Sequence, residues 1–127
     1  MGINTHVYSY YGFRTEWNEE FSNASEEVYE ANIEKYGYNN VPADADIEYI
    51  SDGMSCEYMV FGERLYDSGD ARWGEMNHSN EIEINDEILA KMKAEYMEQF
   101  KRLYPDHYEW ASSFPWKIVN FVHYSWG

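Results

Sequence analysis

The sequence lacks the basic residues that would bring it to a nucleic acid. Lysine and arginine number 9 against 24 acidic residues, which gives a formal net charge of −15. This sign excludes ordinary nucleic-acid binding, because affinity for phosphates comes from lysine and arginine, and it also disfavours anionic membranes. We therefore expect no direct contact with a nucleic acid or a membrane.

Cysteine and long apolar runs are also scarce. Cys56 is the single cysteine, so no internal disulfide forms, which suits a reducing cytosol. The N-terminal residues show no basic segment followed by an apolar one, as a secretory signal requires. No apolar run approaches the roughly 20 residues that a transmembrane helix needs. These absences predict a cytoplasmic protein.

Apolar and aromatic residues, in contrast, are plentiful. Hydrophobic residues make up 44% of the 127 residues and aromatic residues alone 19%. This is enough for one real core, so we expect a single compact acidic domain over residues 1–127. The negative charge belongs to the first hundred residues: residues 1–50 and 51–100 each carry a net −8, whereas residues 101–127 carry +1.

Hydrophobic periodicity predicts an α+β fold. The predicted strands cover residues 6–13, 46–50, 57–66 and 116–124. The predicted helices cover residues 16–36 and the segment from Asn85 to Pro105, and residues 106–113 form one further helical turn. The order β-α-β-β-α-β predicts an antiparallel sheet of about four strands packed by two main helices, as in ferredoxin-like topologies.

Three local signals refine this prediction. Thr15 is a suitable N-cap for the first helix, although Asn23, followed by Glu26, is an alternative start. Gly37 suits the end of that helix. Gly62 indicates a bulge inside its strand.

The first predicted helix is the main candidate for a functional surface. Its exposed side carries a row of acidic residues: Glu16, Glu20, Glu27, Glu30 and Glu34. Neighbours four residues apart lie about 6 Å apart along the axis. That is comparable to the phosphates of one nucleic-acid strand, which repeat every ~3.4 Å. The row can therefore occupy lysine and arginine sites meant for phosphates, with Asp44, Asp46 and Glu48 extending it. The alternative is an ordinary solvated helix face.

Metal, cofactor and catalytic signatures are missing from the pattern. No calcium-binding loop is present, and the four histidines do not show zinc-ligand spacing. His6 and His123 lie in the two terminal strands, where they are expected to meet as ordinary sheet residues. There is no phosphate-binding glycine loop and no hydrolase motif. We therefore expect a protein without metal, cofactor or enzymatic activity.

Two segments resemble small proteins of tailed bacteriophages: residues 52–62 (DGMSCEYMVFG) and residues 67–74 (DSGDARWG). The short length, acidity and aromatic richness are also similar to phage inhibitors of host defence, including anti-CRISPR proteins and DNA mimics. The resemblance implies an inhibitor acting in a bacterial host cytoplasm. It assigns no function to any single residue.

The sequence thus favours a non-enzymatic acidic inhibitor that binds the basic nucleic-acid-binding surface of a host protein complex. Three other classes remain open. The first is a module that sequesters a small ligand or a metal, and the second is an accessory subunit whose acidity serves solubility. The third and least favoured is a small hydrolase that uses scattered Asp, Glu and His side chains.

Overall fold

The computed structural model describes residues 3–69 and 79–126. Its strands are β1 (Ile3–Glu16), β2 (Tyr49–Ser51), β3 (Tyr58–Asp67) and β4 (Lys117–Trp126), and its helices are α1 (Glu19–Tyr36), α2 (Asp86–Leu103) and α3 (Tyr108–Ser112). The α+β class, with one antiparallel four-stranded sheet and two main helices, is confirmed. Short 3-10 turns cover Ala43–Ala45 and Pro105–His107. The strand predicted from residue 46 begins only at Tyr49. The phage-like residues 70–74 lie outside the described residues.

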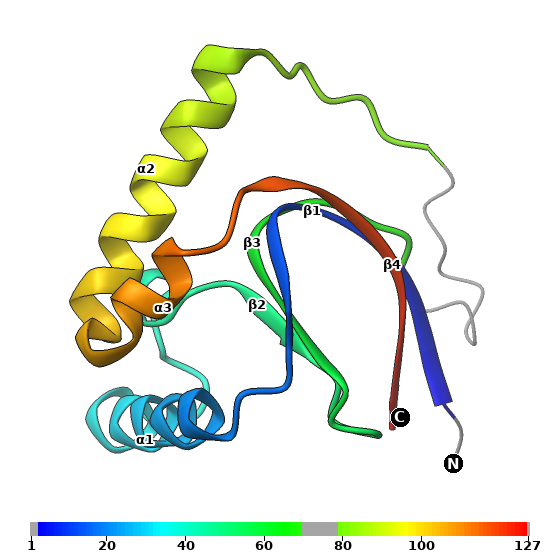
Figure 1. The fold of residues 1–127 in the computed structure, drawn as a ribbon. Helices are drawn as coiled ribbons and strands as arrows, with labels where there is room; N and C mark the ends of the chain where they lie inside the picture. Colours follow the sequence, from blue (N-terminus) through cyan, green and yellow to red (C-terminus); the bar gives the residue numbers. More distant parts are fainter. Residues whose placement is uncertain (1–2, 70–78, 127) are drawn as a thin grey trace.

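The strands lie in the order β2-β3-β1-β4, and all neighbours are antiparallel. β1 is longer than predicted, because its N-terminal part pairs with β4 and its C-terminal part with β3. The strands curve together into an arch, with the helices gathered on one side (Figure 1).

Gly62 is not the site of a bulge, contrary to the prediction. The register shift lies at Ser9 and Tyr10 of β1, where β3 accommodates the extra residue Leu65. Gly62 instead faces Gly12 across the two strands. A Cβ atom on Gly12 would lie 1.8 Å from the backbone oxygen of Phe61, so the two backbones approach this closely only because both residues are glycine.

The main core lies between the helices and one face of the sheet. Its fully buried centre is aromatic: Phe13 of β1, Phe61 of β3, Phe21 of α1 and Phe100 of α2 are at most 1% exposed. The rings of Phe21 and Phe61 meet edge to face with centroids 4.9 Å apart. Aromatic residues therefore join the helices to the sheet.

The opposite face of the sheet carries a smaller cluster. Tyr8, Tyr10 and Val60 are buried there, with Phe121 of β4 and Tyr58 of β3 packed against them. Side chains alternate between the two faces along a strand. Phe13 of β1 therefore faces the helices, whereas Tyr10, three residues earlier, faces the opposite side. This alternation explains why both faces of β1 are rich in aromatic residues.

Candidate partner-binding surface

Helix α1 starts at Glu19, three residues later than predicted. Asn18 is the N-cap, and its side-chain oxygen accepts a 2.9 Å hydrogen bond from the backbone N–H of Phe21. Thr15 is instead buried within β1, and Glu16 is the last residue of that strand. β1 continues this far because its last residues pair with β3. At the other end, Gly37 terminates the helix as predicted, with its N–H donating to the carbonyl of Ile33.

One side of α1 is held against the rest of the molecule. Phe21 is fully buried in the core. The hydroxyl of Ser25 is hydrogen-bonded to that of Tyr49 in β2. Further along, the side-chain amide of Asn32 donates to the carbonyl of Ala45 at 3.0 Å. These contacts fix the rotation of the helix, so the opposite side faces solvent.

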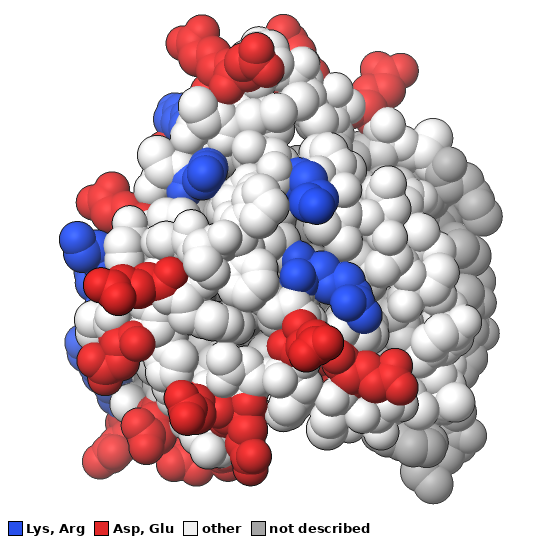
Figure 2. All heavy atoms as spheres, viewed as in Figure 1, with Lys and Arg blue, Asp and Glu red and all other residues white. Residues whose placement is uncertain are grey.

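That outward side is an acidic stripe, made of Glu19, Glu20, Glu26, Glu27, Glu30 and Glu34, all of them exposed. At 3.6 residues per turn, the six lie within an arc of about 120°, and they span about 22 Å of helix axis. No ion pair to any of them is present within residues 3–69 and 79–126. In Figure 2 a group of acidic side chains lies at the lower left of the molecule, over α1, and others lie at the top and near the centre.

The structure brings together four of the five helix residues that the sequence singled out. Glu20, Glu27, Glu30 and Glu34 lie in the acidic stripe, whereas Glu16 belongs to β1. Glu19 and Glu26 complete the stripe but were missing from the sequence-based set. A rotation of 100° per residue places both on the same side of the helix as the other four glutamates, so the spacing alone was sufficient to find them.

Asp46 and Glu48 do not extend this surface, contrary to the prediction. Asp46 Oδ1 accepts hydrogen bonds from the hydroxyl of Tyr104 at 2.7 Å and from the N–H of Ile47 at 2.8 Å. Burial raises the pKa of Asp46, and these two hydrogen bonds oppose the rise. Glu48 Oε1 accepts from the hydroxyl of Tyr10 at 2.6 Å and lies 3.4 Å from Nε of Arg64. Both carboxylates hold the segment before β2 in place.

Asp44 is exposed, as an extension of the acidic surface requires. Its backbone carbonyl accepts hydrogen bonds from Gln99 and Arg102 of α2. The segment is thus tied to α2 through the backbone, which leaves the carboxylate of Asp44 toward solvent.

Exposed aromatic side chains accompany the glutamates. Tyr29 on α1 is 56% exposed and Tyr38, just beyond the helix, is 77% exposed. By helical rotation, Tyr29 lies beside Glu26 at the edge of the acidic stripe. Tyrosine is enriched at protein–protein interfaces because it offers large contact area together with a polar tip. The surface therefore combines charge with an apolar anchor.

The histidines of the terminal strands meet as the sequence predicts. His6 and His123 are directly opposite in the β1–β4 register. His6 Nδ1 lies 2.8 Å from Asp67 Oδ1, and His123 Nδ1 lies 2.8 Å from the hydroxyl of Tyr58. Among the described residues, no group of three or more His, Cys, Asp or Glu side chains is placed to hold a metal ion. No helix in that part of the chain is long and apolar enough to cross a membrane.

Acidification is expected to destabilise the fold through His123. Burial lowers the pKa of His123, Asp52 opposes this effect, and His6 adds to it. The folded chain therefore binds a proton at His123 less readily than the unfolded chain does. The free energy of unfolding that depends on neutral His123 is complete above pH 6.5, the ordinary histidine pKa, and it is lost as the pH falls below that value. Urea unfolding at about pH 7.5 and about pH 5.5 should show a loss in the wild type that His123→Gln reduces. His107→Gln is the matched control, and equal pH dependence in all three proteins would contradict the assignment.

Comparison of the chain with protein-family models, with curated proteins and with solved structures finds no match. A functional proposal must therefore come from the geometry and charge of the acidic stripe itself.

Proposed function

We propose that the protein binds, through the acidic stripe of α1, a basic surface that normally holds the phosphates of a nucleic acid. The observation that carries this proposal is the set of six exposed glutamates on one helix face, none of them ion-paired within the described residues. A surface kept for solubility alone has no need to concentrate its charge on one rigid helix.

The density of charge suits this role. Six carboxylates over about 22 Å of axis amount to one charge every ~4 Å, against ~3.4 Å for the phosphates of one strand. Like charges at this spacing repel each other at a cost of a few tenths of a kcal/mol per pair. The repulsion lowers the stability of the free protein. A groove lined by lysine and arginine relieves the repulsion, so the same charges favour the bound state.

Charge and aromatic contact have separate tasks in this proposal. The negative field accelerates encounter with a basic partner, and it does so over about 8–10 Å at ordinary salt. Tyr29, 56% exposed beside the stripe, supplies apolar contact that slows dissociation. The resemblance to phage anti-defence proteins favours a nucleic-acid-processing complex of a bacterial host as the partner.

Salt and DNA competition test the proposal together. The immobilised protein is exposed to nuclease-treated bacterial lysate and washed with increasing salt from about 50 to about 200 mM. We expect a basic nucleic-acid-binding protein to be captured, to elute steeply with salt and to be displaced by duplex DNA. A captured protein that resists salt and is not displaced by DNA would contradict the proposal, as would the absence of any basic protein among the eluates.

A further inference from the structure

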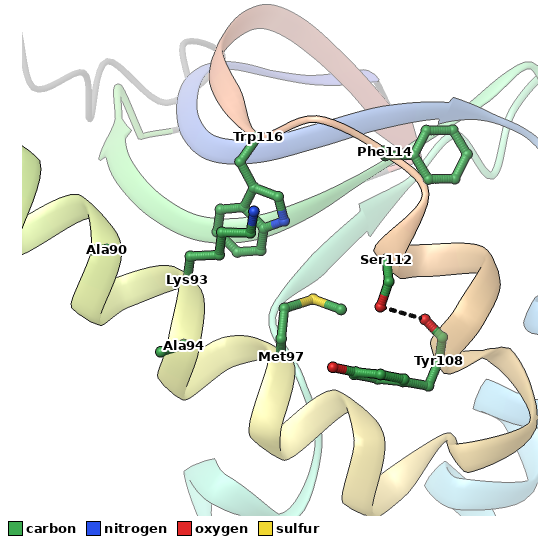
Figure 3. A pocket seen from close by; sticks show the side chains of 8 residues that line it. All are labelled: Ala90, Lys93, Ala94, Met97, Tyr108, Ser112, Phe114 and Trp116. Atoms are coloured by element: carbon green, nitrogen blue, oxygen red, sulfur yellow. Dashed lines mark hydrogen bonds between the residues drawn. The ribbon is translucent and has the colours of Figure 1, made fainter.

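A groove of about 410 Å³ lies away from the acidic stripe, between α2, α3 and the segment that leads into β4. Ala90, Lys93, Ala94 and Met97 of α2 form one side, and Tyr108, Ser112, Phe114 and Trp116 complete it (Figure 3). Its volume falls in the range of small-molecule sites, which is about 300–1,000 Å³.

Two small residues of α2 produce the groove. Ala90 and Ala94 lie one helical turn apart, and their short side chains leave a hollow beside the larger Trp116. The walls are rigid, because Trp116 packs on the rings of Tyr11 and Tyr96 with centroids 5.0 and 5.4 Å away. Phe114 stacks on Phe13 of the core at 5.0 Å. The hollow is therefore formed before any ligand arrives.

The described residues that line the groove include no aspartate or glutamate, although the chain has 24 acidic residues. Lys93 is the one charged residue among these described residues. The residues three and four positions away along α2 are Leu89, Ala90, Tyr96 and Met97, none of them acidic. Lys91 differs, because its Nζ lies 4.0 Å from Glu95 Oε1. Within the described part of the chain no ion pair to Lys93 is found, so this ammonium is left for an anion from outside.

Hydrogen-bond donors predominate among the polar groups of the groove. The indole N–H of Trp116 and the hydroxyl of Tyr108 have no hydrogen-bond partner among residues 3–69 and 79–126. Ser112 already donates to the carbonyl of Tyr108 at 2.8 Å, as the dashed line in Figure 3 shows. Figure 3 shows Lys93 extending from α2 on the side of the groove from which Ala90 and Ala94 also come. An apolar lining with donors and a cation suits a ligand that is apolar at one end and carries acceptors at the other.

We propose that this groove binds small apolar carboxylates, with a ring or branched chain against Met97, Tyr108 and Trp116 and the carboxylate toward Lys93. The proposal does not depend on the function assigned to the acidic stripe, because no residue of α1 lines the groove.

Calorimetric titration with 2-naphthoate tests this site. We expect a Kd of about 10–100 µM for a ligand of this size in a preformed groove. Lys93→Gln should weaken binding about tenfold by removing a charge-assisted contact, and Ala94→Phe should abolish it by filling the hollow. The neutral analogue 2-naphthalenemethanol should bind the wild type about as weakly as 2-naphthoate binds Lys93→Gln.

Lys91→Gln is the matched control, because it removes a lysine of the same helix that does not line the groove. It should leave the Kd of 2-naphthoate unchanged. The proposal is overturned if 2-naphthoate shows no binding at millimolar concentration, or if Ala94→Phe, folded as judged by circular dichroism, binds it as the wild type does. Equal weakening by Lys91→Gln and Lys93→Gln would also overturn it, since general charge would then explain the effect.

Discussion

Replacement of Gly12 by alanine is expected to lower the free energy of unfolding by about 4 kcal/mol or more, a large part of the stability of a domain this size. An added Cβ would lie 1.8 Å from the carbonyl oxygen of Phe61 and 2.8 Å from Cα of Gly62. Both neighbours are backbone atoms of a paired strand, so neither moves aside without breaking the β1–β3 pairing. Urea unfolding followed by circular dichroism measures the loss.

Gly53→Ala is the control for this prediction. No atom of residues 3–69 and 79–126 lies within 4 Å of a Cβ at Gly53, so its effect should stay within about 0.5 kcal/mol. Gly62→Ala should behave like Gly12→Ala, because its Cβ would lie 2.1 Å from the carbonyl oxygen of Tyr11 and its φ is +139°. Comparable stabilities for the Gly12 and Gly53 variants would show that the close approach of the strands is not required.

The elements that local sequence determines were predicted well. Helix α2 begins after Asn85, whose side chain caps the N–H of Ile88 at 2.9 Å, and it ends before Pro105. Segments rich in aromatic and β-branched residues predicted β3 and β4 to within two residues at each end. The facing pair of Gly12 and Gly62 was not predictable, because a single glycine in a strand also indicates a bulge and only the register shows which applies.

In the candidate surface, too, residues placed by local sequence were predicted and residues placed by distant contacts were not. Glu20, Glu27, Glu30 and Glu34 of α1 were found because helical periodicity places them on one side without knowledge of any other element. Asp46 and Glu48 were misassigned because their partners are distant: Tyr104 lies 58 residues from Asp46, and Tyr10 lies 38 residues from Glu48. The sequence alone does not distinguish a carboxylate that is hydrogen-bonded within the fold from one that is exposed to solvent.

The largest effect on binding is expected from reversing three charges of the acidic stripe. The variant Glu20→Lys/Glu27→Lys/Glu34→Lys should weaken binding to the captured basic partner about 100-fold or more at low salt, because three attractive contacts become repulsive. Each reversal changes the charge by two, so the net charge rises from −15 to −9. The three side chains are exposed and in no ion pair within the described residues, so folding should be preserved. Affinity measured against salt for both proteins provides the test.

Net charge and charge position are separated by a second triple variant. Glu57→Lys/Glu81→Lys/Glu83→Lys also has a net charge of −9, and its three positions are exposed but lie outside α1. If the stripe itself is recognised, this control should lose only a few-fold in affinity, from the weaker long-range field, and should keep most of the salt dependence. Equal losses in the two triple variants would show that the partner responds to total charge alone, and a stripe variant that binds like the wild type would refute phosphate mimicry by α1.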